Sequence, residues 1–154
     1  MAQKPIVIGC DNAAVALKET IKALLTEQGI AYEDVGIRSD AEATPYPSVA
    51  ERVAEEIIKS NYTKEGILIC GTGIGMSIAA NKFPGIYAAV CHDAYSAERA
   101  RLSNNTNVLC LGARVIGPEL AKKLTAEWLH LEFQGGKSAE KLRVIHDIEK
   151  RHMK

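Results

Sequence analysis

The chain has 154 residues, a length that fits one domain, residues 1–154, with a core stable without disulfides or metal. Nineteen basic and nineteen acidic side chains cancel, so no overall field attracts nucleic acid or an anionic membrane. No apolar run approaches the roughly 18 residues of a membrane span, and we expect no export signal. A small, locally charged ligand and a cytoplasmic location are therefore expected.

The cysteines and histidines are dispersed, with no CxxC pair and no cysteine and histidine at ligand spacing. This pattern argues against a zinc site and against a disulfide framework, and it favours a reducing compartment. We expect neither a metal nor a cofactor. The residues concerned are Cys10, Cys70, Cys91, Cys110, His92, His130, His146 and His152.

The first half of the chain predicts two strand–helix units. A β-branched apolar run at 5–10 is typical of a buried strand, and a helical apolar period follows within 11–29. A second strand is expected at 31–36. After a polar loop at 37–47, a helix is expected at 48–60.

The second half continues the alternation, with apolar runs at 66–70, 87–91 and 108–112. Helices are expected to begin near Gly75, Ala94 and Gly117. Strict alternation predicts a doubly wound three-layer α/β/α sandwich with a five-stranded parallel sheet, and a ligand site beyond the carboxyl ends of the strands. A last charged helix, at about 139–150, is expected to pack on a partner subunit.

The segment GILICGTGIGMSIAANK (66–82) is the most informative one. A buried strand runs into three glycines within five residues and then into a helix. Such a loop can turn several backbone N–H groups inward toward an anion, helped by the helix dipole. The motif GxxxxGK[ST] is absent, and the third glycine of GxGxxG would fall at Met76, so two common nucleotide motifs are excluded.

Cys70 ends the strand that precedes this loop. A thiol that faces the N-terminus of a helix is favoured as a thiolate, which makes it a candidate base or nucleophile. The alternative is a small buried hydrophobic residue, and this is what we expect of the other three cysteines.

Four further polar residues flank the predicted strands. Asp11 could contact a ligand or cap a helix, and Tyr46 could reach over the site or cover apolar surface. Asn104 and Arg114 stand before and after the fifth strand, and we expect both at the end of the sheet that holds Cys70. Arg114 suits a phosphate or a structural ion pair equally well.

With these segments in place, the sequence closely resembles ribose-5-phosphate isomerase B and the related galactose-6-phosphate isomerase subunits over nearly its whole length. The resemblance implies the sandwich fold, metal-independent catalysis, and dimers whose active sites combine residues of both subunits. The matching pieces are GCD (9–11), YP (46–47), ICGTGIGMSIAANK (69–82), YSA (95–97), NNTNVL (104–109), LGARVIG (111–117) and FQGG (133–136).

The resemblance also implies roles for individual residues. Cys70 would move a proton between C1 and C2 of the sugar, and Thr72 would assist proton movement at the oxygens. An enediolate needs donors where negative charge develops, and the loop amides would supply them. The loop positions are Gly71, Gly73, Ile74 and Gly75. The positions matched to sugar contacts are Asp11, Tyr46 and Asn104, and Arg114 matches a phosphate contact.

Four substrate-binding positions depart from the family pattern. Asn12 and Ser103 stand where the family usually has histidines. The histidine that is usual in place of Ser103 opens the sugar ring. Lys137 and Lys141 replace two arginines, which keeps the charge but loses the bidentate fork. The neutral hydroxyl of Ser103 is a poor acid and base at neutral pH compared with an imidazole. His92 is a candidate to supply the missing imidazole, and the alternative is a histidine in a surface loop.

Two hypotheses follow. The first is an aldose–ketose isomerase, by default for ribose 5-phosphate and ribulose 5-phosphate, with galactose 6-phosphate, allose 6-phosphate or a tetrose phosphate as alternatives. The second is a catalytically weak binding or partner subunit of a two-component isomerase. The intact pair of Cys70 and Thr72 favours the isomerase. We expect this enzyme to form a homodimer or a dimer of dimers.

Overall fold

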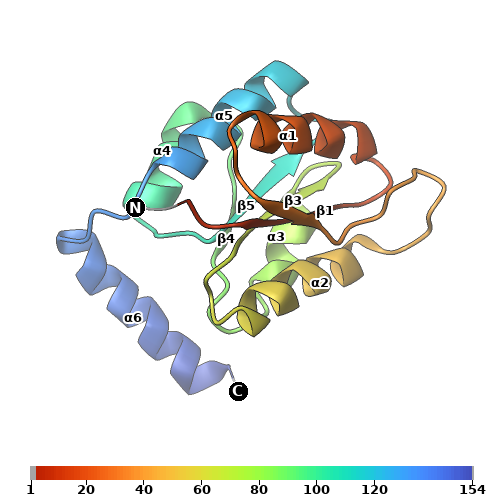
Figure 1. Cartoon of the computed structure of the whole chain (residues 1–154). Helices are drawn as coiled ribbons and strands as arrows, with labels where there is room; N and C mark the ends of the chain where they lie inside the picture. The colour runs from red at the N-terminus through yellow and green to blue at the C-terminus, as the bar shows by residue number, and fades with distance from the viewer. Residues whose placement is uncertain (1–2, 154) are drawn as a thin grey trace.

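The computed structural model describes residues 3–153, whose strands form one parallel sheet in the order β2-β1-β3-β5-β4 (Figure 1). The predicted doubly wound sheet is therefore confirmed. The bounds of the strands are β1 Ile6–Cys10, β2 Tyr32–Asp34, β3 Glu65–Cys70, β4 Ala88–Val90 and β5 Val108–Gly112.

The helices form two layers around this sheet. Helices α1, α4 and α5 cover one face and α2 and α3 the other, while α6 stands apart from both layers (Figure 1). None of the helices within residues 3–153 has the length and apolar character needed to cross a bilayer. The bounds are α1 Val15–Glu27, α2 Tyr46–Lys59, α3 Ile74–Ala80, α4 Ala94–Leu102, α5 Pro118–His130 and α6 Lys137–His152.

The three central strands carry the core. Every residue of β1, β3 and β5 is buried, as expected for strands that are covered on both faces. The register pairs Cys10 with Ile69 and Cys70 with Gly112, so the three strands end at nearly the same level. This level edge brings the segments after Cys10, Cys70 and Gly112 together at one end of the sheet.

Several boundaries differ from the sequence prediction by a few residues. Helix α2 begins at Tyr46 rather than at residue 48, because Pro47 falls in the first turn, where a missing N–H costs nothing. Strands β2 and β4 keep only three residues each, since both lie at the edges of the sheet and pair on one side. Helix α6 extends two residues beyond the predicted range at each end.

The amino end of the sheet holds a buried ion pair between Glu65 and Arg101. The Arg101 guanidinium lies 3.7 Å from the centroid of the Trp128 ring and donates a 2.7 Å hydrogen bond to the carbonyl of Thr106. The indole N–H of Trp128 donates to the Thr106 hydroxyl at 3.0 Å. Together these contacts fix the turn between α4 and β5.

Candidate active site

The loop after β3 closes around the sulfur of Cys70. Gly73 has φ +79°, a left-handed conformation that favours glycine, and it caps the start of α3. Its backbone N–H donates to Cys70 Sγ at 3.0 Å, and Cys70 is only 5 % exposed. The Thr72 side chain is exposed, and its hydroxyl oxygen accepts from the Ile74 N–H at 3.2 Å. A thiol is thus held at the mouth of a loop rich in amide donors.

Strand β5 supports this loop from behind. A Cβ on Gly112 would lie 2.8 Å from the backbone of Thr72, so only glycine permits this approach. Gly112 belongs to one of the matching sequence motifs, but the sequence analysis predicted no role for it. The available signal was a glycine at the end of a strand. The Arg114 N–H donates to the Gly71 carbonyl at 3.0 Å, and a Cβ on Gly71 would lie 3.5 Å from the Arg114 guanidinium.

Tyr46 lies across the start of α3. A Cβ on Gly75 would come within 2.4 Å of the Tyr46 ring, so the ring rests directly on the glycine. Tyr46 is 40 % exposed, so part of its side chain is open to solvent. The ring therefore packs against the loop that follows Cys70, and a role of Tyr46 in the site stays a prediction.

The other three cysteines also lie in the core. Burial raises the pKa of the Cys10 and Cys91 thiols to about 11 and also raises that of Cys110. Such thiols are protonated at neutral pH and are inert. Residues 3–153 contain no group of three or more potential ligands placed to hold a metal ion.

Asp11 and Asn12 follow β1 at the same edge. The Asp11 N–H donates to the carbonyl of Ile69 at 3.2 Å, which ties this turn to the neighbouring strand β3. One Asp11 carboxylate oxygen accepts from the Ala13 N–H at 3.0 Å and so stabilises the turn into α1. Asn12 is exposed. Asp11 therefore has a local structural role while lying beside the end of β3.

His92 also lies at this end of the sheet, but its ring is bound to the backbone. Its Nε2 atom accepts a 2.9 Å hydrogen bond from the N–H of Gly112. The short strand β4 ends before the level of Gly112, so it supplies no partner for this N–H. Burial lowers the pKa of His92, with an opposing contribution from Asp93. The neutral ring, with its proton on Nδ1, satisfies this geometry, so Nε2 is not free for acid–base work.

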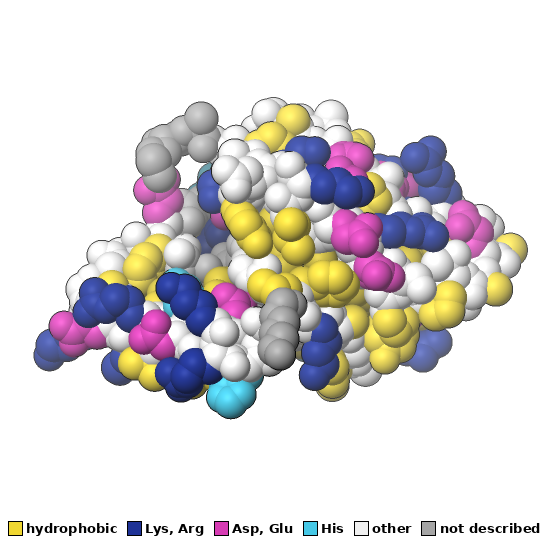
Figure 2. Space-filling view, turned by 90° about the horizontal axis from the view of Figure 1, so that it is seen from below, with side chains coloured by type: hydrophobic (Ala, Val, Ile, Leu, Met, Phe, Trp, Pro, Cys, Tyr) yellow, Lys and Arg dark blue, Asp and Glu magenta, His cyan; other side chains and the backbone are white. Residues whose placement is uncertain are grey.

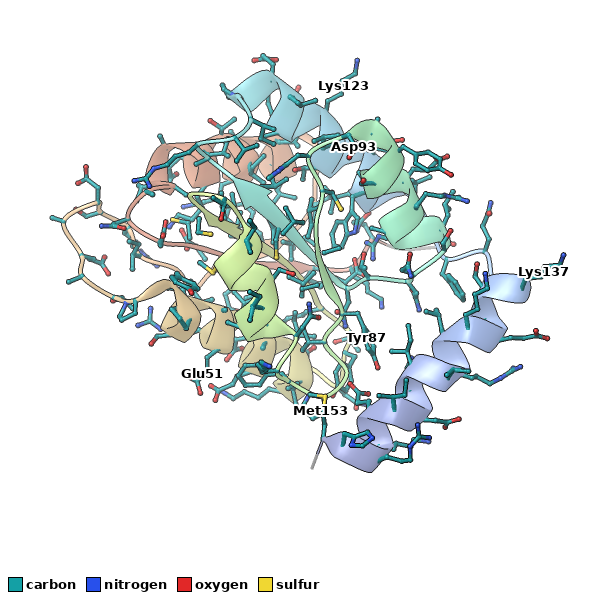
Figure 3. All side chains as sticks on the ribbon, turned by 180° about the vertical axis from the view of Figure 1, so that it is seen from behind. Glu51, Tyr87, Asp93, Lys123, Lys137 and Met153 are labelled. Atoms are coloured by element: carbon teal, nitrogen blue, oxygen red, sulfur yellow. The ribbon has the colours of Figure 1, made fainter. Side chains whose placement is uncertain are left out.

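Four predicted site residues lie at the end of the sheet opposite to Cys70; they are Ser103, Asn104, Lys137 and Lys141. Helix α4 runs back from the carboxyl end of β4 to the amino end of β5, and β5 spans roughly 16 Å. The expectation that Asn104 shares an end with Cys70 is therefore wrong, because a residue before a parallel strand lies at its amino end. Figure 3 shows the two ends of the sheet through Asp93, which follows β4, and Tyr87, which precedes it.

The predicted residues thus form two groups in one chain. The carboxyl half-site comprises Asp11, Asn12, Tyr46, Cys70–Gly75 and Arg114. The amino half-site comprises Ser103, Asn104, Lys137 and Lys141. In the second group Ser103 is half-buried and the other three are exposed, and Lys137 projects from the start of α6 (Figure 3). A cavity of about 170 Å³ separates the turn at 104–106 from α6.

Comparison with known proteins gives a consistent family. A family model described as Ribose/Galactose Isomerase matches residues 6–145. The chain is 53 % identical over 140 residues to a D-erythrulose-4-phosphate isomerase of Pectobacterium atrosepticum, covering 91 % of each chain. It is 48 % identical over 147 residues to ribose-5-P isomerase B of Listeria innocua, covering 96 % of this chain and 98 % of that one.

The fold has close counterparts among solved structures. The crystal structure of ribose-5-phosphate isomerase B from Mycoplasma genitalium with bound ribulose-5-phosphate superposes with a TM-score of 0.90 at 34 % identity. The match covers 95 % of this chain and 96 % of that chain.

Proposed function

The chain belongs to the ribose/galactose isomerase family, and we propose that it interconverts an aldose phosphate and the corresponding ketose phosphate. The reference pair is ribose 5-phosphate and ribulose 5-phosphate. One observation carries the proposal: the Cys70 thiol sits at the end of a central strand and receives the amide of Gly73. This arrangement provides a base beside donors for a developing oxyanion.

The proposed reaction moves one proton from C2 to C1 and another from O2 to O1, and it exchanges no electrons with a cofactor. The Cys70 thiolate removes the proton from C2 of the open-chain aldose, and the electron pair shifts onto O1 as an enediolate forms. Amides of residues 71–75 hold the negative charge. The Thr72 hydroxyl transfers a proton between O2 and O1, and the thiol then returns its proton to C1. A free thiol base suits a reducing compartment, and we place the enzyme in the cytoplasm.

A two-fold homodimer accounts for the two separated half-sites. In this assembly the amino half-site of one protomer meets the carboxyl half-site of its partner. Exposed apolar side chains on α3 and α6 support such an interface, and apolar and charged side chains are interspersed on the face that includes α6 (Figure 2). These side chains are Ile74, Ile78, Val144, Ile145 and Ile148.

The phosphate would be held by cations from both protomers. Arg114 of the carboxyl half-site rests against the loop at Gly71, whereas Lys137 and Lys141 project from the first turns of α6. Lysine acts as a point charge without a planar fork, so it holds the phosphate with less directional constraint than arginine.

A tetrose phosphate is the second candidate substrate, and Ser103 favours it. Ribose 5-phosphate exists mainly as a closed ring, and its opening benefits from an imidazole that Ser103 cannot replace. His92 does not compensate, because its Nε2 is occupied by Gly112. Erythrose 4-phosphate cannot close a five-membered ring, because its O4 is esterified. The name of the Pectobacterium atrosepticum relative also refers to a tetrulose phosphate.

The direct test is a panel of four aldose phosphates incubated with the purified chain and assayed for ketose. The panel comprises ribose 5-phosphate, erythrose 4-phosphate, galactose 6-phosphate and allose 6-phosphate. We expect turnover of ribose 5-phosphate or erythrose 4-phosphate without any added partner protein. If no sugar is converted, the isomerase proposal fails and a binding or partner subunit remains.

The variant Ser103→His distinguishes the pentose from the tetrose. If ring opening limits the enzyme, kcat/KM for ribose 5-phosphate should rise, within the 10²–10⁴ range of general acid–base catalysis. The open-chain tetrose should gain little. Equal gains on both substrates would show that position 103 acts elsewhere than in ring opening.

A further inference from the structure

Helix α6 carries both lysines of the amino half-site but has few constraints on its direction. Of its residues 137–152, Leu142 alone is buried. The chain enters the helix through Gly135 and Gly136, which have φ of +72° and +66°. Two consecutive glycines allow the connection to bend easily. The orientation of α6 must therefore be set by contacts further along the helix.

Glu149 supplies such a contact near the other end of the helix. One carboxylate oxygen accepts from the N–H of Gly85 and the other from the hydroxyl of Tyr87, both at 2.8 Å. Burial, together with this hydrogen bond, raises the pKa of Tyr87, so the phenol remains a donor at neutral pH. The rings of Tyr87 and His146 lie beside each other, with centroids 5.5 Å apart.

The same segment is held from its other side by Asn107. The Asn107 side-chain oxygen accepts from the Tyr87 N–H, and its NH₂ group donates to the Gly85 carbonyl, each at 2.8 Å. Asn107 directly follows the turn that carries Ser103 and Asn104. Residues 85–87 therefore link the turn of the amino half-site to the helix that carries its lysines.

We propose that Glu149 is a positioning residue that holds α6 so that Lys141 and, to a lesser degree, Lys137 meet the substrate phosphate. This inference rests on the proposed function. Glu149 lies twelve residues after Lys137, roughly 18 Å along the helix. Without its two hydrogen bonds α6 can tilt about the glycine pair. Lys141 lies further from that pivot than Lys137 and is displaced more.

The first experiment compares Glu149→Ala, Glu149→Gln and Tyr87→Phe. In Glu149→Ala, KM for the sugar phosphate should rise about tenfold while kcat stays within about twofold, the scale of one or two lost hydrogen bonds. Glu149→Gln should restore most of the affinity, because its carbonyl can accept from Gly85 and its NH₂ group can donate to the Tyr87 oxygen. Tyr87→Phe, which keeps the Gly85 bond, should fall between the two.

The matched control is Asp147→Ala, which removes an exposed carboxylate from the same helix. It should leave KM unchanged. Each variant is compared with the parent for thermal unfolding and for mass in solution, so that loss of fold or of the dimer is seen directly. A fall in kcat alone, or a fall in stability with unchanged KM, overturns the proposal.

The second experiment is a double-mutant cycle with Lys141→Ala. If Glu149 acts by placing Lys141, Glu149→Ala should add little to the KM effect of Lys141→Ala. Fully additive effects would show that Glu149 does not act through this lysine. The dissociation constant of inorganic phosphate, measured by calorimetry, should follow the same pattern without any turnover. This binding measurement tests the role of Glu149 even if the isomerase proposal fails.

Discussion

The two half-sites are built in different ways. The carboxyl half-site is formed mainly by backbone at the ends of buried strands: the Gly73 N–H donates to Cys70 Sγ, and Gly112 packs against the backbone of Thr72. The amino half-site consists of side chains on a surface turn and on α6, a helix with a single buried residue. Chemistry that depends on backbone is difficult to alter without loss of the fold, whereas recognition by surface side chains can change freely.

The departures from the family pattern agree with this difference. Ser103, Lys137 and Lys141 belong to the amino half-site, and only Asn12 lies at the other end. In this chain we therefore expect the departures to affect substrate recognition more than the proton transfer proposed for Cys70.

The largest expected effect is on the carboxyl half-site, in Cys70→Ser. Serine keeps the shape of the side chain but is a far weaker base, so kcat should fall at least about 10²-fold. The free energy of unfolding should change little, because the volume is nearly conserved. Activity is measured as ketose formation and stability by urea unfolding.

The control for this prediction is Cys91→Ala, which alters a core thiol whose pKa is raised by burial. It should retain turnover in proportion to the folded protein. Near-normal kcat in Cys70→Ser would remove Cys70 from the mechanism and with it the contrast between the half-sites.

The second prediction tests whether the half-sites meet across a dimer. Cys70→Ala damages one half-site and the double variant Lys137→Ala, Lys141→Ala damages the other. After subunit exchange, a mixed dimer contains one intact site, so an equimolar mixture should regain about a quarter of the wild-type sites. Confirmed exchange without any gain in activity would show that each chain forms its site alone.

Sequence reasoning predicted the carboxyl half-site better than the amino half-site, for a physical reason. A buried strand, a glycine loop and a helix follow each other in the chain, so local patterns were sufficient to place Cys70 beside the amides. The expected position of Asn104 was wrong because a residue that precedes a parallel strand lies at the end of the sheet opposite to Cys70, and only the direction of the strand determines this. The hydrogen bonds of Glu149 to residues 85–87 join segments more than sixty positions apart, and no local pattern predicts them.

The third prediction concerns the contact between Tyr46 and Gly75. Gly75→Ala places a methyl group within 2.4 Å of the ring, so we expect a loss of about 1–3 kcal/mol in the free energy of unfolding. In a Tyr46→Ala background the clash is absent, and alanine should stabilise α3 by up to about 1 kcal/mol. Urea unfolding of the four proteins measures this change of sign.

The control for this cycle is Gly117→Ala, at a glycine where a Cβ would meet open space and φ is −82°. It should change stability by only a few tenths of a kcal/mol. A destabilisation by Gly75→Ala that persists without the Tyr46 ring would show that the loop itself, rather than the tyrosine, excludes a side chain.

The smallest expected effect concerns His92, which supports the carboxyl half-site through Gly112. Its pKa is lowered in the folded state, so between the folded value and the unfolded value of about 6.5 the unfolded chain binds more protons. Its contribution to stability is therefore complete above about pH 6.5 and is lost as the pH falls through the folded value. His92→Gln keeps an acceptor for Gly112 but cannot titrate, so its stability should fall less than that of the parent between pH 7.5 and 5.5, by less than about 1.4 kcal/mol per pH unit. His152→Gln, at an exposed position on α6, should follow the parent. Identical pH dependence of His92→Gln and the parent would mean that His92 takes up protons equally in the folded and unfolded states, which would contradict a lowered pKa in the folded state.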